Sequence, residues 1–159
     1  MIVNRTTYID QLVRSRGNGL IKIVTGIRRS GKSFLLKKLF RQHLLDDGVQ
    51  DDHIIIIDME SRKNKAFKDP DYLLDYIDNV MKDDNTYYII IDEVQEVNDF
   101  VEVLSTLSVT EGTDVYVTGS NSRFLSSDVV TEFRGRGDEI HVWPLSFKEY
   151  MSVYDGSVE

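Results

Sequence analysis

Residues 26–33 read GIRRSGKS and match the pattern G-x-x-x-x-G-K-[ST] without a mismatch, which leaves few folds open to this chain. An apolar run, residues 20–25 (LIKIVT), precedes the motif and predicts a buried strand. Apolar residues at helical spacing follow it and predict a helix over residues 32–45. A glycine-bearing loop between a strand and a helix is the context that this motif requires. The sequence therefore predicts an α/β domain organised around a phosphate-binding loop, or P-loop.

The residue types of this loop suit a bound polyphosphate. Glycines let the backbone wrap closely around phosphate oxygens, and the positive end of the following helix dipole points at the same anion. Lys32 supplies a point charge to the β- and γ-phosphates, and the Ser33 hydroxyl is a hard oxygen ligand for Mg²⁺. The residues that we expect to contact the nucleotide are Gly26, Ile27, Arg28, Arg29, Ser30, Gly31, Lys32, Ser33 and Phe34.

The remainder of the chain alternates between strand and helix patterns. Short apolar runs predict further strands at residues 53–58, 87–91, 114–118 and 139–142, and helical spacing predicts helices at residues 70–81 and 100–107. Continuous apolar strands that alternate with helices indicate a parallel sheet covered on both faces, a three-layer α/β/α sandwich. Ligands of such sheets bind at the carboxyl ends of the strands, where the motifs of this chain fall.

The apolar strand at residues 87–91 runs directly into two acids, Asp92 and Glu93. We expect Asp92 to orient Mg²⁺ and its waters, and Glu93 to polarise an attacking water as general base. An acid at both positions favours hydrolysis over binding alone. Asp58 and Glu60 follow the preceding strand and face the same edge of the sheet. We interpret them as a solvated turn, with a site as the alternative.

Two polar segments follow the last predicted strands. In VYVTGSNS, residues 115–122, Thr118, Ser120 and Asn121 are candidates to touch the γ-phosphate or the attacking water, and a simple polar turn is the alternative. In the glycine-bearing segment before residues 139–142, Arg136, ahead of Arg134, is a candidate to stabilise transition-state charge. The alternative there is surface charge on a loop.

Composition limits the remaining classes. With 159 residues and 41% hydrophobic content, the chain suits one domain, residues 1–159. It has no cysteine, which excludes disulfides and thiolate metal sites, and we expect a cytoplasmic location without membrane insertion. The net charge of −8 leaves nucleic acid an unsupported partner. One basic cluster, which we interpret as serving a polyphosphate and a solvated helix face, comprises Arg28, Arg29, Lys32, Lys37, Lys38 and Arg41.

Together these segments resemble AAA+-type ATPases of bacteria and archaea, whose ATPase core precedes a separate C-terminal domain. The resemblance covers most of the chain through RTTYIDQL, VTGIRRSGKSFLL, YIIIDEVQEV, VYVTGSNSRFLS and FRGRGDEIHVWPLSFKEY. It implies ATP rather than GTP, and a sheet ordered 5-1-4-3-2. It assigns no role to Gln95. The phosphate, magnesium, water and sensor roles that it implies fall on Gly31, Lys32, Ser33, Asp92, Glu93 and either Ser120 or Asn121.

The leading hypothesis is Mg-dependent ATP hydrolysis, coupled to conformational change in a partner or attached domain. Lys32, Glu93, Asn121 and Arg136 would be its catalytic residues, and ATP and Mg²⁺ its cofactors. Since family members continue into a lid and a C-terminal domain, we expect this chain to be a truncated core, with a homo-oligomer as an open alternative. A nucleotide-dependent switch with little hydrolysis is the second hypothesis. A small-molecule kinase is the third, and the acidic pair and the GSNS stretch disfavour it.

Overall fold

The computed structural model describes residues 2–120 and 137–154. Within these residues a parallel sheet of five strands has the order β2-β3-β4-β1-β5. The predicted order is therefore confirmed, read from the opposite edge. The strands are β1 (Ile21–Thr25), β2 (Ile54–Asp58), β3 (Tyr87–Asp92), β4 (Thr113–Thr118) and β5 (Gly137–His141).

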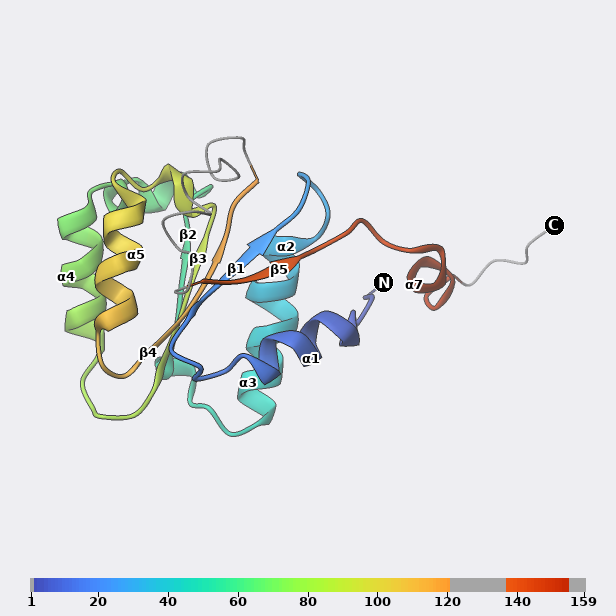
Figure 1. Cartoon of the computed structure of the whole chain (residues 1–159), viewed down its shortest axis with the longest axis horizontal. Coiled ribbons are helices and arrows are strands. Elements are labelled where there is room, and N and C mark those ends of the chain that lie inside the picture. The colour runs from blue at the N-terminus through green and yellow to red at the C-terminus, as the bar shows by residue number, and fades with distance from the viewer. Residues whose placement is uncertain (1, 121–136, 155–159) are drawn as a thin grey trace.

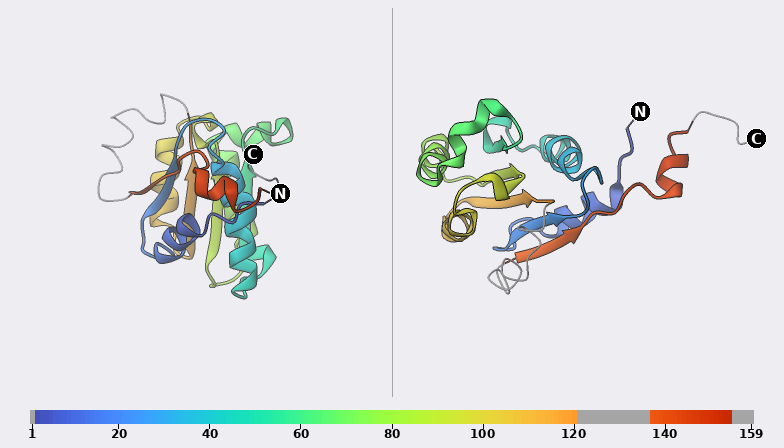
Figure 2. Two further views of the ribbon diagram at one scale, coloured as in Figure 1. Left: turned by 90° about the vertical axis from the view of Figure 1, so that its right-hand side faces the viewer. Right: turned by 90° about the horizontal axis from the view of Figure 1, so that it is seen from above.

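Helices cover both faces of the sheet and complete the predicted three layers (Figures 1 and 2). On one face lie α4 (Pro70–Val80) and α5 (Phe100–Val109), and on the other lie α1 (Thr6–Arg14), α2 (Lys32–Phe34) and α3 (Arg41–Asp46). The short helix α7 (Phe147–Met151) stands away from the sheet, beyond the end of β5 (Figure 1). The sequence patterns did not predict α1.

The interior strand β3, which lies between β2 and β4, shows how the apolar runs build two cores. Every residue of β3 is buried. Ile89 and Ile91 belong to the core beneath α4 and α5, whereas Tyr88 and Ile90 belong to the core beneath α1 and α3. Successive side chains of a strand point to opposite faces, so a strand that is covered on both sides needs an unbroken apolar run.

The helix predicted over residues 32–45 is continuous in the structure, but it is not uniformly α-helical. Between α2 and α3 the segment Leu35–Phe40 is a π-helix. Such π-helical turns occur frequently at functional sites, and Lys37 lies within this one. The predicted helix at residues 70–81 ends at Val80 and begins with an N-cap, since the Asp69 carboxylate accepts the N–H groups of Asp71 and Tyr72 at 2.9 and 3.2 Å.

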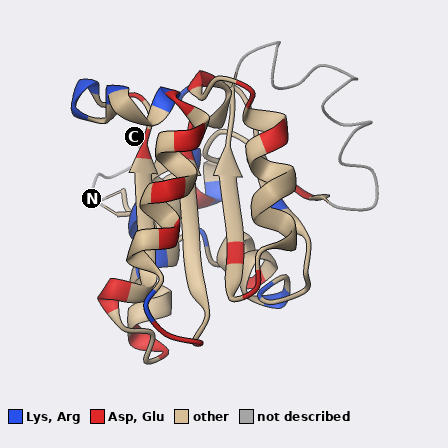
Figure 3. Ribbon diagram, turned by 90° about the vertical axis from the view of Figure 1, so that its left-hand side faces the viewer, with Lys and Arg blue, Asp and Glu red and all other residues tan. Residues whose placement is uncertain are grey.

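Acidic residues recur along α4, which faces the viewer in Figure 3. Asp71, Asp75 and Asp78 are exposed there at spacings of three and four residues, which places them on one side of the helix. This face repels polyanions. Within the ranges that the structure describes, every helix is too short or too polar to span a lipid bilayer.

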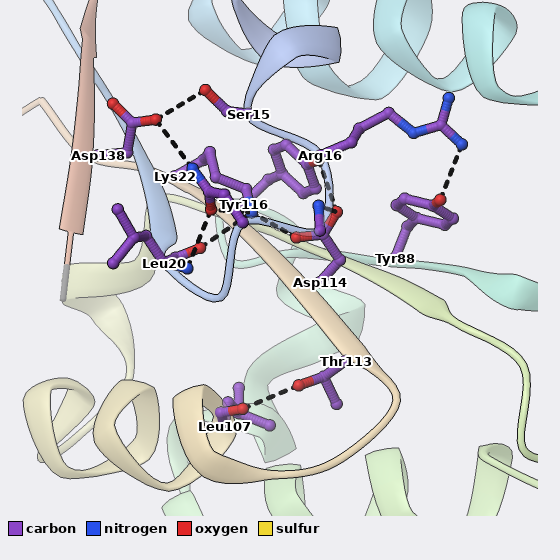
Figure 4. Close-up of polar contacts among 12 residues, drawn as sticks. Ser15, Arg16, Leu20, Lys22, Tyr88, Leu107, Thr113, Asp114, Tyr116 and Asp138 are labelled. Carbon is purple, nitrogen blue, oxygen red and sulfur yellow. Dashed lines mark hydrogen bonds and ion pairs between the residues drawn. The ribbon is translucent and has the colours of Figure 1, made fainter.

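A buried lysine, Lys22, lies near the amino-terminal end of β1 (Figure 4). The P-loop follows the opposite end of this strand. The Lys22 ammonium group is fully buried and donates to Leu20 O at 2.9 Å, to Asn18 Oδ1 at 3.2 Å and to the Asp114 carboxylate. Burial raises the pKa of Tyr116, whose hydroxyl donates to Asp114 Oδ2 at 2.8 Å. A buried ion pair needs such hydrogen bonds to offset its desolvation. The cluster thus joins β1 to β4 at the ends of these strands that lie opposite the P-loop.

We expect Asp114→Asn to lower the free energy of unfolding by about 3–5 kcal/mol, because it leaves the Lys22 charge buried without a carboxylate. Urea denaturation monitored by circular dichroism measures the change. The double variant Lys22→Met, Asp114→Asn removes the unpaired charge and should recover part of the loss. A double variant less stable than Asp114→Asn would contradict this account.

His53 lies between two carboxylates where the chain enters β2. Its Nδ1 is 2.6 Å from Asp52 Oδ1, its Nε2 is 2.7 Å from Asp83 Oδ2, and its ring stacks on Tyr87 with centroids 4.4 Å apart. The hydrogen bond to Asp52, with that to Asp83, raises the pKa of His53 against the opposing effect of burial. The charged form therefore bridges the two acidic side chains.

His53 is expected to stabilise the fold mainly when it is protonated. Because its pKa is raised on folding, its contribution is complete below about pH 6.5 and is lost as the pH rises through the folded-state pKa. His53→Gln should therefore lower the free energy of unfolding more at about pH 5.5 than at about pH 9. An Asp83→Asn background should reduce this difference. Equal losses at both pH values would refute the assignment.

Candidate functional site

The loop between β1 and α2 contains residues with positive φ, a backbone conformation that most residue types avoid. Gly26, Arg29 and Gly31 have φ values of 145°, 68° and 94°. A Cβ atom on Gly26 would lie 2.3 Å from the carbonyl oxygen of Val142, so only glycine fits beside the segment that follows β5. Left-handed conformations turn successive N–H groups toward one side of a loop, which forms an anion-binding concavity. The local geometry therefore agrees with the predicted P-loop.

Lys32 lies inside this loop and is nearly buried. Its Nζ donates to the carbonyl oxygens of Gly26 and Ile27, each at 2.9 Å. Burial lowers the pKa of Lys32, while the charges of Glu93, Asp92 and Glu60 act in the opposite direction. The ammonium group is thus held within the loop and faces the acidic side of the site.

Asp92 joins three elements at the carboxyl edge of the sheet. Its side chain is fully buried, and its Oδ1 accepts hydrogen bonds from the Ser33 and Thr118 hydroxyls, both at 2.7 Å. Ser33 comes from α2 and Thr118 from the end of β4, the strand between β1 and β3. The sheet order therefore brings the P-loop and the acidic pair into direct contact.

Lys37, which the sequence placed only in the general basic cluster, contacts the acids of the site directly. Its Nζ lies 2.8 Å from Asp58 Oδ2 and 3.2 Å from Asp92 Oδ2. Burial alone would lower the pKa of Lys37, but the hydrogen bond to Asp58 and the charge of Asp92 raise it above its ordinary value. The predicted turn is present, since Asp58 Oδ1 accepts the N–H of the exposed Glu60 at 3.0 Å. The Asp58 carboxylate is not simply solvated, however, because its Oδ2 pairs with Lys37 beside Asp92 of the adjacent strand.

The predicted basic cluster is divided between different partners. Lys32 points into the loop, Lys37 pairs with the acids of the site, and Arg41 pairs with Asp51. Lys38 is exposed on the helix. This division agrees with a site for a polyphosphate beside a solvated helix face better than with one continuous basic surface.

Glu93 is held by the residues around it. Its backbone is left-handed at φ 56°, and its N–H donates to Thr118 Oγ1 at 2.9 Å. The Ser120 hydroxyl lies 3.1 and 3.0 Å from Oε1 and Oε2 of the Glu93 carboxylate, and Gln95 Nε2 donates to Oε2. Ser120, a candidate to touch the γ-phosphate or the attacking water, therefore contacts the carboxylate of the predicted general base.

Arg5 connects the P-loop to the segment that follows β5. Its guanidinium group donates to Ser30 O at 2.6 Å, to Trp143 O at 2.5 Å and to Glu149 Oε1 of α7 at 3.1 Å. It also lies over the Tyr8 ring, 4.6 Å from the centroid. Arg5 is 7% exposed, so these partners compensate a buried charge. No spacing in the sequence pointed to it, because its partners lie far away along the chain.

A cleft of about 390 Å³ lies between the P-loop and the acidic residues that follow β2 and β3. Its lining contains Arg28, Arg29, Gly31, Lys32, Ser33, Phe34, Glu60 and Glu93. Most of the predicted nucleotide contacts thus line one cleft together with the predicted base. Asn121, Arg134 and Arg136 lie outside the described residues.

The donor set beside this cleft fits a hard divalent cation. Asp58, Glu60 and Asp92 each offer a carboxylate oxygen, and these three oxygens lie within 4.8 Å of one another. The Ser33 hydroxyl is hydrogen-bonded to Asp92. Oxygen ligands of this kind suit Mg²⁺.

Residues 18–151 match the protein family described as AAA domain. An uncharacterized protein of Haemophilus influenzae is 34% identical over 151 residues, covering 94% of this chain and 38% of that protein. An uncharacterized protein of Methanocaldococcus jannaschii is 29% identical over 141 residues, covering 87% of this chain and 30% of that protein. The chain therefore spans about a third of the length of these relatives.

Solved structures of AAA+ proteins share the fold. Caenorhabditis elegans PCH-2 superposes with a TM-score of 0.59 at 21% identity, over 94% of this chain and 42% of that one. AMPPCP-bound DnaA from Aquifex aeolicus gives 0.57 at 15% identity, over 99% and 53%. Drosophila ORC bound to DNA gives 0.57 at 11% identity, over 92% and 94%. At these identities the likeness establishes the fold alone.

The matching family covers most of the chain, and the sheet order and P-loop geometry agree with it. The chain thus belongs to the family of AAA domains and folds as the core of an AAA+-type P-loop ATPase.

Proposed function

We propose that this domain binds ATP with Mg²⁺ and hydrolyses it to ADP and phosphate. The observation that carries this proposal is the contact between Ser33 Oγ and Asp92 Oδ1, at 2.7 Å. This contact joins the end of the phosphate-binding loop to the buried acid, and Ser33 and the neighbouring Glu93 both line the cleft. A second acid beside the loop favours hydrolysis over binding alone.

The P-loop residues would bind the triphosphate. The concave backbone from Gly26 to Gly31 offers N–H donors, and Lys32 exchanges its two carbonyl acceptors for β- and γ-phosphate oxygens. Ser33 and Asp92 would hold Mg²⁺, which neutralises phosphate charge when it is bound. Lys37 shares the negative charge of Asp58 and Asp92, which limits the repulsion between these acids and the phosphates.

Glu93 would act as the general base. A water oxygen attacks the γ-phosphorus, the bond between that phosphorus and the β–γ bridging oxygen breaks, and ADP leaves with that oxygen. The proton of the water passes to the Glu93 carboxylate and then to solvent or phosphate. Lys32 stabilises the charge that develops on the γ-phosphate oxygens. Ser120, which already contacts Glu93, is placed to bind the same water or phosphate.

We further propose that hydrolysis is coupled to movement in a partner or an attached domain. The greater length of both relatives supports this proposal. Arg5 supports it as well, since it connects the P-loop to α7. Asn121 and Arg136 stay candidates for the water contact and for transition-state stabilisation.

Lys32→Met should weaken the binding of MgATP by about 10- to 100-fold, because one charged hydrogen-bonding group to the phosphates is lost. Isothermal titration calorimetry measures the affinity, and a thermal melt checks the fold. Lys38→Met, an exposed lysine on the same helix, is the matched control and should bind normally. Equal affinities for the wild type and Lys32→Met would overturn the proposed binding mode.

Glu93→Gln should preserve ATP affinity and lower kcat by about 100-fold or more, since an amide cannot accept the proton of the attacking water. Phosphate release measures turnover. Glu96→Gln, an exposed acid on the same turn, is the control and should leave kcat unchanged. Undiminished turnover in Glu93→Gln would remove the proposed base. Tight binding with negligible wild-type turnover, also in the longer protein, would favour the switch hypothesis instead.

A further inference from the structure

Gln95 is a buried amide beside the proposed base. It lies on the turn Val94–Glu96, which follows β3, and only 5% of its surface is exposed. Its neighbours Val94 and Val97 are fully buried in the core beneath α4 and α5. This packing fixes the backbone on both sides of Gln95, so its side chain approaches Glu93 from a rigid part of the fold.

The two ends of the Gln95 amide differ in their partners. Nε2 donates to Glu93 Oε2, whereas among the described residues no donor binds the buried Oε1. An unsatisfied buried acceptor destabilises a fold, and an apolar side chain of the same length would avoid that cost. The hydrogen bond to the charged Glu93 carboxylate is the interaction that an apolar residue would not provide.

Ser120 is the other side-chain donor that the described residues offer to the Glu93 carboxylate, and it is the more readily exchanged of the two. It lies beyond the end of β4, is only partly buried, and has a single hydroxyl proton. When that proton is given to a phosphate oxygen or to a water, the carboxylate keeps the hydrogen bond from Gln95. The Glu93 main chain stays fixed through its N–H bond to Thr118. Gln95 therefore sets the side-chain orientation of Glu93.

We propose that Gln95 is a positioning residue that holds the Glu93 carboxylate in the orientation from which it accepts the proton of the attacking water. This inference rests on the proposed function, because it assigns Gln95 a role that acts through Glu93. A general base must lie within hydrogen-bonding reach of the proton that it takes, and a small displacement lowers the rate strongly. Gln95 is not among the residues that line the cleft, so the proposed role acts through Glu93 rather than through contact with the nucleotide.

Gln95→Met tests the proposal, since methionine keeps the length and packing of the side chain but removes the donor. We expect kcat to fall by about tenfold or more, while the affinity for MgATP stays within about twofold of the wild type. Gln42→Met, which removes an exposed amide bound to Asp46 on α3, is the matched control and should leave both values unchanged. An unchanged or increased kcat in Gln95→Met would overturn the proposal.

A double-variant cycle separates positioning from a general effect on the fold. In a Glu93→Gln background the carboxylate is already gone, so Gln95→Met should cause no further fall in kcat. An equal fold-change in both backgrounds would show a structural effect and refute the proposal. If Gln95→Met fails to fold, Gln95→Leu removes the donor without adding a second carboxyl group beside Glu93, and it should show the same loss of kcat.

The same measurements distinguish failure of this inference from failure of the proposed function. If Glu93→Gln retains full turnover, the base assignment fails, and the role of Gln95 fails with it. If Glu93→Gln is inactive but Gln95→Met is fully active, only the inference on Gln95 is refuted.

Discussion

The buried carboxylate of Asp92 is the constraint on which the arrangement of the cleft depends. Moving a charge out of water is costly unless partners replace its hydration. Asp92 obtains them from Ser33 at the start of α2, from Thr118 at the end of β4 and from Lys37 one helical turn further along. Each partner belongs to an element adjacent to β3 or packed against the sheet. Satisfying this one acid therefore brings the loop, the strands and the helix together.

Local patterns were sufficient to predict most elements of the fold. The strand at residues 87–91 could be identified because both faces of a covered parallel sheet require apolar residues, and the structure buries Ile89 and Ile90 in opposite cores. The P-loop could be identified because its backbone requires glycine at particular positions. At Gly26, for example, a Cβ atom would collide with the carbonyl oxygen of Val142. The order of the strands followed from the family resemblance, since periodicity carries no information about which strands are neighbours.

The features that the sequence did not reveal depend on contacts between distant segments. The pairing of β2 with β3 places Asp58 beside Asp92, and the helix that follows the P-loop brings Lys37 to both acids. Neither contact can be read from the spacing of residues along the chain. Lys22 likewise lies in an apolar run, and its buried charge is stabilised by Asp114, a residue of another strand. Such pairs obey the rule that buried charges must be matched, but the rule does not name the partner.

The buried guanidinium of Arg5 ties parts of the molecule that the sheet does not connect directly. The planar guanidinium group offers its N–H donors in fixed directions. It binds the Ser30 carbonyl of the phosphate loop on one side, and the Trp143 carbonyl and the Glu149 carboxylate on the other. A rigid group cannot follow both sides when they move apart. A displacement of Ser30 would therefore either shift the region around α7 as well or break a hydrogen bond that is buried at its Ser30 end. The strength of that buried bond thus bears on how independently the phosphate loop and the segment after β5 can move.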